Sequence, residues 1–387
     1  MKPCDSIKQR FVELYAVWRR EFRIVLGDVG VMVFFFGLPV LYPVVYTLIY
    51  NPEVARDIPV AVVDNCRTAG SREFVRMADA AEAISITGYA ADLNEARRWM
   101  NEKACYGIMV IPEEYSRKIG RGEQAVIPFY VEMSLLLRYR AFLTALTDLS
   151  IAAGVQIRQL EGLPSVSPVG NAAIFLGDPT QGFASFVIPG ILVLILQQSL
   201  ILGITMLGGG VAERRRLYGG RDPLAVKAPA AITVMGKSLC YFTLYIPLII
   251  YILVFIPRMF SLPHYGSVTD VLLFIVPLVF ASIFMGMALQ RFVRERESSM
   301  IMFVFTSVIF LFLSGLTWPR YAMSPLWLWV GDAIPSTWGI EGFVRINSNG
   351  AALRQSVQPY LALWFLAIAY FILATASKWM EENRKMK

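Results

Sequence analysis

Charged residues are scarce in this chain of 387 residues, and the scarcity is concentrated in particular stretches. Asp, Glu, Lys and Arg make up 17% of the sequence and hydrophobic residues 56%, whereas a typical soluble domain has about 25% charged residues. Long stretches without Asp, Glu, Lys, Arg or His occupy residues 29–50, 179–212, 238–257, 271–290, 298–319 and 355–377. About 20 apolar residues cross a bilayer as a helix, and a helix satisfies its own backbone inside lipid. We therefore predict an α-helical membrane protein with six transmembrane helices, which excludes an ordinary soluble domain.

Histidine is almost absent. The single histidine, His264, lies in the short segment LPHYGS. A lone histidine in a loop is normally an ordinary solvated residue, and no cluster of Cys or carboxylates accompanies it to form a metal site. A Ser-His-Asp arrangement also lacks a credible histidine. The sequence therefore predicts no catalytic residue, no metal ligand and no bound cofactor.

Cysteine is also rare, with four residues in the chain. Cys66 and Cys105 both fall in the longest hydrophilic segment. Two interpretations are open: a disulfide, which an oxidising compartment would permit, and two separate thiols. We favour the two separate thiols.

A complete P-loop is missing, although one stretch resembles its end. The residues AITVMGKS (231–238) finish with the Gly-Lys-Ser that closes a nucleotide-binding loop. The pattern requires a glycine at its first position, after a strand, but Ala231 occupies that position and a predicted membrane helix follows. We therefore expect this chain not to bind ATP itself, and we interpret Lys237 as the cytoplasmic end of the third span.

The predicted spans contain no ionisable residue except Cys and Tyr. Carriers driven by protons or sodium ions use buried carboxylates or broken helices as relays and ion sites. Their absence argues against transport that this chain powers by itself. If the protein moves a compound, the energy must come from elsewhere.

The net charge of +7 indicates a membrane surface rather than nucleic acid. Most Lys and Arg residues outside the spans and the segment 51–178 lie in the N-terminal tail, in the predicted loop 208–237, in the loop after the fourth span and in the C-terminal tail. The loops on the other side hold only Arg258, Arg320, Arg345 and Arg354. The positive-inside rule then places both termini in the cytoplasm. We expect a multi-pass protein of the inner (cytoplasmic) membrane.

The segments outside the spans differ in pattern. Residues 1–28 carry apolar side chains at helical spacing opposite Arg and Glu, which predicts an amphipathic helix at the cytoplasmic interface before the first span, 29–50. Residues 317–355 contain a cluster of tryptophans between short apolar runs, which is typical of external re-entrant or interfacial helices. Residues 378–387 form a cytoplasmic tail. Five spans, with the loop 208–237, occupy residues 179–377.

Residues 51–178 alternate between strand-like and helix-like patterns, which predicts an inserted extracytoplasmic mixed α/β domain. The expected strands are 58–64, 83–89, 105–112 and 125–132, and the expected helices are 71–81, 91–102 and 135–160. Residues 161–182 are rich in Pro and Gly and are interpreted as a linker back to the membrane.

With these features in place, the chain resembles the type-2 ABC exporter permeases that carry a large external domain, a group similar to multidrug or drug-efflux permeases. Residues 212–239 are similar to the loop after the second span of that family, with matches at Glu213, Arg214, Pro229, Gly236 and Lys237. Its usual second glutamate is Arg215 here, and its usual Gly-Thr is Gly219-Gly220. The stretches 106–123 and 312–346 resemble the external domain's Ile-Pro segment and the exit of the fifth span.

The resemblance implies a transporter subunit without a nucleotide site. Such permeases form dimers, with a second copy or a paralogue, in contact with membrane lipid, and a separate ATP-binding-cassette ATPase subunit binds the ATP. The residues that the resemblance points to for ATPase coupling are Glu213, Arg214, Arg215, Arg216, Arg19 and Arg20, against the alternative of a solvated basic loop. The stretch 291–299 is a candidate second contact. Gln197, Gln198 and Ser199 are candidates for the substrate path, against the alternative of helix–helix hydrogen bonds.

We therefore expect export of an amphipathic, drug-like or lipid-like compound out of the cytoplasm or inner leaflet. The alternatives are a membrane sensor or receptor whose external domain binds a ligand, and a surface-assembly protein. The short cytoplasmic segments disfavour a receptor, because they leave no room for a signalling domain.

Overall fold

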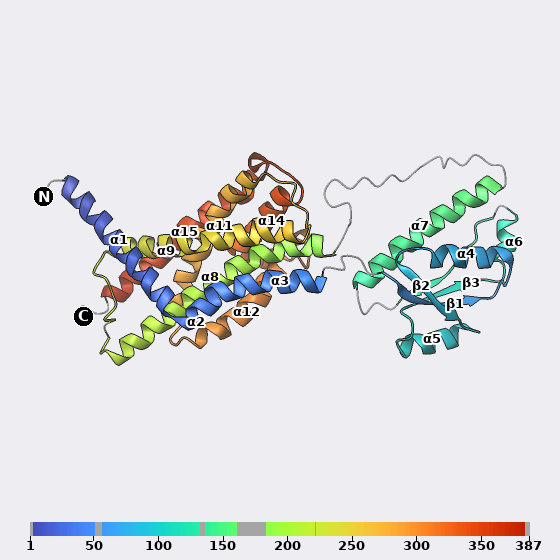
Figure 1. Cartoon of the computed structure of the whole chain (residues 1–387), viewed down its shortest axis with the longest axis horizontal. Coiled ribbons are helices and arrows are strands. Elements are labelled where there is room, and N and C mark those ends of the chain that lie inside the picture. The colour runs from blue at the N-terminus through green and yellow to red at the C-terminus, as the bar shows by residue number, and fades with distance from the viewer. Residues whose placement is uncertain are drawn as a thin grey trace. The chain divides into compact units, whose positions relative to one another are not determined.

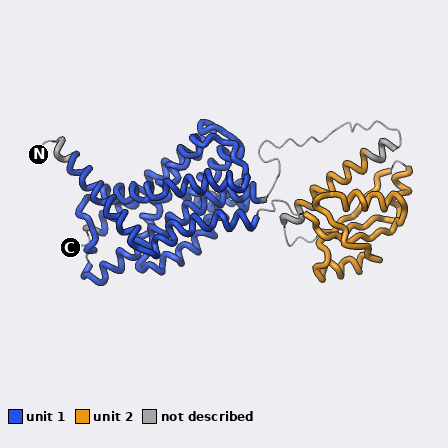
Figure 2. Tube along the Cα trace, viewed as in Figure 1, with its two compact units in different colours: residues 1–51, 175–387 blue, residues 52–174 orange. Residues whose placement is uncertain are grey.

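In the computed structural model, the described residues are 3–50, 56–121, 123–131, 136–160, 183–220 and 222–383. They belong to two compact units, a helical unit of residues 1–51 and 175–387 and a second unit of residues 52–174 (Figure 2). The predicted linker, residues 161–182, lies outside the described residues. Each unit is described by itself below.

The helical unit contains five helices that are long and apolar enough to cross a membrane, judged by length and composition. They are Val29–Tyr50, Ala184–Leu217, Ala230–Met259, Val268–Phe292 and Leu353–Glu381. The fifth predicted span, 298–319, instead forms the shorter helix α12 (Ser298–Leu313), which ends where Ser314 turns its hydroxyl back to the carbonyl of Leu311. The described residues thus contain five helices of spanning length, where the sequence predicted six.

The second unit, residues 52–174, interrupts the helical unit in the sequence, and the helices of the helical unit otherwise follow one another along the chain. Their bounds are α1 (Pro3–Gly27), α2 (Val29–Met32), the π-helical turn η1 (Val33–Gly37), α3 (Leu38–Tyr50), α8 (Phe183–Leu217), α9 (Ala230–Ile250), η2 (Tyr251–Phe255), α10 (Ile256–Met259), α11 (Val268–Leu289), η3 (Gln290–Phe292), α12, η4 (Arg320–Ala322), α13 (Pro325–Asp332), α14 (Pro335–Asn347), η5 (Leu353–Ser356) and α15 (Val357–Asn383). The predicted loop 208–237 is therefore shorter than expected. α8 continues to Leu217 and α9 begins at Ala230, because charged residues do not by themselves end a helix.

Helix α8 lies at the centre of the helical unit and packs against α3, α11, α12 and α14 (Figure 1). Its core side chains, such as Ile188, Leu192 and Leu200, are inaccessible to solvent. The short helix α14 is also enclosed, with Ile340 and Phe343 buried. The segment 335–347 thus packs inside the bundle rather than lying on its surface.

The second unit is a four-stranded mixed sheet with helices on both faces. The strand order is β2-β1-β3-β4, with β1 (Ile58–Asp64) parallel to β2 (Ile84–Tyr89) and β3 (Gly107–Ile111), and β4 (Phe129–Val131) antiparallel to β3. The helices are α4 (Ala69–Asp79), α5 (Leu93–Asn101), α6 (Tyr115–Ile119) and α7 (Leu136–Leu160). The predicted strands and helices are present in order, so the mixed α/β prediction for this segment is confirmed.

Alternate side chains of β1 point to the two faces of the sheet, as the period of a strand requires. Val60 and Val62 enter the core with α4 and α7, whereas Ala61 and Val63 enter the core with α5. Both faces of β1 are therefore covered. This explains why β1 is an almost continuous apolar run in the sequence.

The two cysteines of this unit are free thiols on opposite faces of the sheet. Burial raises the pKa of Cys66, but hydrogen bonds with the Ser116 and Thr68 hydroxyls lower it by more, so the net shift is downward. Burial raises the pKa of Cys105, which is inaccessible to solvent. The two separate thiols that the sequence favoured are what the structure has.

This contrast predicts unequal reactivity with a maleimide. The thiolate is the reactive form, and each unit of pKa difference changes its fraction about tenfold. We expect Cys66 in the native protein to be modified roughly tenfold or more faster than Cys105, with a rate that rises with pH through a pKa below the ordinary value for a thiol. Peptide mass spectrometry after timed labelling measures both rates. Equal rates in the native state would contradict the assignment, and denaturation should abolish the difference.

Candidate functional site

The charged residues singled out in the sequence gather at one end of the helical unit. There α1, the last turns of α8, the connection 222–229 and the turn 290–297 come together, and both chain termini point to the same end (Figure 1). We call this the basic end. It contains all six residues that the resemblance assigned to ATPase coupling.

Arg296 links three of these segments. Its backbone N–H donates to the Glu213 carboxylate at 2.7 Å, and its guanidinium reaches both Glu213 and Asp28. Asp28 is also the N-cap of α2, accepting a hydrogen bond from the backbone N–H of Val31. Arg296 therefore ties the end of α8 to the junction between α1 and α2.

Three consecutive glycines of α8 let the turn 290–297 lie directly on the helix. A Cβ at Gly208 would meet Gln290 at 2.7 Å, one at Gly209 would meet the backbone of Glu295 and Arg296 at 2.7–2.8 Å, and one at Gly210 would meet the Arg296 guanidinium at 3.0 Å. Backbones approach closely in this way only where side chains are small. We call residues 208–210 the glycine platform.

The arginines that follow Glu213 are held by partners within the chain. Arg214 bonds to Asp222 at 3.0 Å. Arg215 pairs with Glu381 of α15, and Arg216 pairs with Glu295 at 2.9 Å. Burial raises the pKa of Asp222, but its bonds with Arg214 and the backbone of Leu224, with the charges of Arg214 and Arg215, lower it by more. These arginines stabilise the arrangement of the basic end.

The two predicted residues on α1 differ in their surroundings. Arg19 is exposed, whereas Arg20 donates to the carbonyl oxygen of Pro223 at 3.4 Å. Their neighbour Glu21, which is 4% exposed and pairs with Lys237, is not among the predicted site residues. The prediction of an amphipathic interfacial helix over residues 1–28 implies no partner for Glu21. The i to i+4 spacing of Lys237 and Tyr241 could have indicated one.

The three polar residues in the middle of α8 are buried and point to different helices. Gln197 donates to the Ser336 hydroxyl of α14 at 3.1 Å, and Gln198 accepts from Thr306 of α12. The Ser199 hydroxyl lies 3.1 Å from that of Tyr245 on α9. Within the described chain these contacts are helix–helix hydrogen bonds, one of the two interpretations that the sequence left open. A role in the substrate path remains a prediction.

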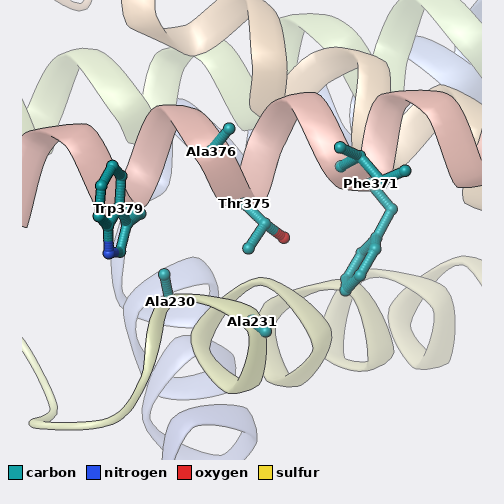
Figure 3. Close-up of a pocket in the computed structure, with 7 residues that line it drawn as sticks. Ala230, Ala231, Phe371, Thr375, Ala376 and Trp379 are labelled. Atoms are coloured by element: carbon teal, nitrogen blue, oxygen red, sulfur yellow. The ribbon is translucent and has the colours of Figure 1, made fainter.

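A groove with a volume of about 450 Å³ lies between the start of α9 and the last turns of α15. Figure 3 shows its lining, in which Phe371, Thr375 and Trp379 of α15 extend toward Ala230 and Ala231 of α9; Ala376 also lines the groove. Almost all of the lining surface is apolar. Residues 231–238, the stretch that resembles the end of a P-loop, form the first turns of α9, so they are helical rather than a loop.

Chemistry at a metal or a catalytic histidine finds no support in the described residues. No group of three or more His, Cys, Asp or Glu side chains in them could hold a metal ion. His264 contacts the carbonyl oxygen of Leu262 at 2.8 Å through Nδ1. The charged groups of the helical unit instead bond helix ends together.

Five helices of spanning length with a tightly bonded charged end define a multi-pass membrane protein. The comparison with known families is more specific. A family model described as ABC-2 family transporter protein matches residues 30–376, so this chain belongs to the ABC-2 family of membrane transport proteins. No curated protein matches the chain. The resemblance to a type-2 ABC permease is thereby confirmed, and such permeases normally work with an ATPase partner.

The glycine platform predicts the effect of one added methyl group. Gly209→Ala places its Cβ against backbone atoms, which cannot rotate away, so we expect a loss of about 1–3 kcal/mol in stability. Thermal unfolding of the purified protein in detergent measures it. Gly27→Ala is the matched control, because no atom lies within 4 Å of the added Cβ. An unchanged midpoint for Gly209→Ala would show that the turn does not need this close approach.

Proposed function

We propose that this chain is the permease subunit of an ATP-driven exporter, with a separate ATP-binding-cassette subunit that supplies the energy. The observation that carries the proposal is the family match over residues 30–376. The cargo that we propose is an amphipathic, drug-like or lipid-like compound, moved out of the cytoplasm or the inner leaflet. The apolar character of the helical unit supports a cargo that partitions into the membrane.

We propose that the basic end faces the cytoplasm and that residues 52–174 form an extracytoplasmic domain. The positive-inside rule supports this orientation, because Lys and Arg gather at the basic end. Both termini then lie in the cytoplasm, and the protein resides in the inner (cytoplasmic) membrane.

The ATPase then meets the basic end. Because Glu213, Arg214, Arg215 and Arg216 have partners within the chain, we propose that they shape the docking surface and transmit its movement. The direct contact is made by side chains that point outwards. These include Leu217 and Tyr218, which are 80% and 61% exposed at the end of α8, Phe292 at 74%, and Arg19 of α1. Exposed aromatic and apolar side chains among arginines are typical of interface centres.

This surface predicts the result of a reconstitution experiment. In proteoliposomes that contain the co-purifying ATPase, we expect the Leu217→Ser/Tyr218→Ser variant to weaken the stimulation of ATP hydrolysis about fivefold or more, as loss of an interface centre does. Tyr89→Ser is the control, because Tyr89 is similarly exposed, at 58%, in the other unit.

The coupling residues should behave differently from the docking residues. Glu213→Ala and Arg215→Ala should lower the stimulation together with the thermal midpoint. Glu213→Ala removes the acceptor of the Arg296 backbone N–H, and Arg215→Ala removes one of the two cations that pair with Glu381 in the described part of the chain. If both variants and the Leu217/Tyr218 variant stimulate the ATPase as the wild type does, the basic end is not the coupling surface.

We propose that a second permease chain, a copy or a paralogue, packs against α12. This helix has 16 residues, about 24 Å at 1.5 Å per residue, whereas the hydrocarbon core is about 30 Å thick. A short helix is matched poorly to lipid and gains from lying against other helices. Its outer stripe of apolar side chains, Ile301, Val304, Phe305, Val308 and Phe312, is more than half exposed.

A cross-linking experiment tests this interface. In a cysteine-free background, we expect Val308→Cys to form a disulfide, on addition of a mild oxidant, with the same substitution in a second copy or with a cysteine introduced at the matching position of a paralogue. The product is detected as a shift in mass. Leu361→Cys on α15 is the control, because Leu361 is also apolar and exposed, at 59%, but is not on the proposed interface. Equal adduct formation at both positions, or none at Val308, would argue against α12 as the interface.

A further inference from the structure

The contact between α1 and α9 is organised around one buried carboxylate. Glu21 of α1 accepts a hydrogen bond from the Lys237 ammonium at 2.9 Å and another from the Tyr241 hydroxyl. Lys237 and Tyr241 are one helical turn apart on α9, so both face the same carboxylate. Glu21 and Tyr241 are 4% and 1% exposed. A buried charge of this kind is stable only with its partners in place.

The residue before Lys237 brings the two helices together. A Cβ at Gly236 would lie 2.8 Å from the Val17 side chain and 3.1 Å from the carbonyl oxygen of Leu14. α1 therefore lies directly on α9 at this point. The Gly-Lys pair has two functions here: glycine permits the approach, and lysine forms the ion pair.

Tyr241 also contacts the first span. Its ring lies 5.7 Å from that of Phe35, centroid to centroid, and Phe35 belongs to the π-helical turn η1. The Phe35 ring packs on Gly203 of α8, where any Cβ would overlap it. Tyr245, one turn beyond Tyr241, meets the same ring edge to face at 5.0 Å.

The backbone carbonyl of Phe35 lacks its usual α-helical donor, and the Tyr245 hydroxyl donates to it instead. In an α-helix the Phe35 carbonyl would accept from residue 39, but Pro39 has no N–H. The Tyr245 hydroxyl donates to this carbonyl at 3.1 Å and also lies 3.1 Å from the Ser199 hydroxyl. A line of direct contacts thus runs from Glu21 through Tyr241, Phe35 and Tyr245 to the middle of α8.

We infer that Glu21 and Tyr241 are positioning residues, which make the packing of the π-helical turn and of Ser199 depend on how α1 lies against α9. The role of this line in export rests on the proposed function, in which the ATPase acts on the basic end. A π-helical turn suits such a role, because such turns are frequent at functional sites. For two sites to be coupled energetically, both must affect the equilibrium of one shared structural element. Here that element is the π-helical turn η1.

The test measures hydrogen exchange by mass spectrometry on the full chain in nanodiscs, without an ATPase. We expect Glu21→Gln to speed exchange of the backbone amides in 33–41 about tenfold, although Glu21 does not contact them, because the opening of this turn becomes easier. Tyr241→Phe, which removes one oxygen and keeps the ring, should also speed exchange in 33–41. This variant tests the inference even if Glu21→Gln folds poorly. The exchanged pair Glu21→Lys/Lys237→Glu should restore slow exchange.

The matched control is Glu13→Gln, on the same helix, where the carboxylate accepts a solvent-exposed hydrogen bond from Gln9, four residues earlier on α1. It should leave residues 33–41 at the wild-type rate. Faster exchange confined to α1 in Glu21→Gln and Tyr241→Phe would overturn the inference, since the contact would then be local.

A second readout separates this inference from the proposed function. In the reconstituted complex, Tyr245→Phe should lower the maximal stimulation of ATP hydrolysis several-fold without changing the ATPase concentration that gives half of it, because the docking surface is intact. If the exchange result holds and no ATPase is stimulated by the wild-type chain, the proposed function fails and the positioning line stands. If stimulation is normal in Tyr245→Phe, the line has no part in coupling.

Discussion

The helical unit depends on hydrogen bonds between polar groups inside an apolar bundle. α8 makes such bonds in three directions from consecutive residues, with Gln197 bonded to α14, Gln198 to α12 and Ser199 to α9. The other amide atom of each glutamine, Gln197 Oε1 and Gln198 Nε2, is buried without a partner among the described residues. Each bond fixes both the rotation of α8 and its depth relative to a neighbour. Apolar packing alone would allow these helices to slide, because lipid tails are as apolar as the side chains.

The basic end is organised differently, because it is accessible to water and carries charged side chains. Here the helices are joined by ion pairs that connect segments distant in sequence, such as Arg216 with Glu295 and Arg215 with Glu381. An exposed pair such as Arg216 with Glu295 contributes little stability individually, whereas Arg215 is largely buried. The joint effect of these pairs is to give the ends of α8, α15 and the turn 290–297 one arrangement. A partner subunit would then meet a surface that is already ordered.

Much of the architecture could be predicted from the sequence, because it depends on local patterns. Long runs without charge identify helices of spanning length, and alternating patterns identified each strand of the second unit. The shortness of α12 could not be predicted in this way. Hydropathy continues past Leu313, and the helix ends through a turn of backbone and serine hydroxyl that leaves no hydrophobic signal.

The pairing of the candidate site residues was also beyond the sequence. The run Glu213 to Arg216 is visible as a charge cluster, but its partners Asp222, Glu295, Arg296 and Glu381 come from three places in the chain. Only the fold brings them together. The same holds for Glu21, whose partners on α9 are more than 200 residues away.

The glycine platform has a consequence for how this surface can diverge. Gly209 packs on the backbone of the turn 290–297, and Gly208 and Gly210 face the side chains of Gln290 and Arg296. The fit therefore does not depend on the outward side chains of Arg291, Phe292 and Arg294, which are exposed. Those three positions are free to vary in size and charge while the turn keeps its place. In the proposed complex, a related permease could therefore acquire affinity for a different ATPase by substitution at these three positions alone, with its scaffold unchanged.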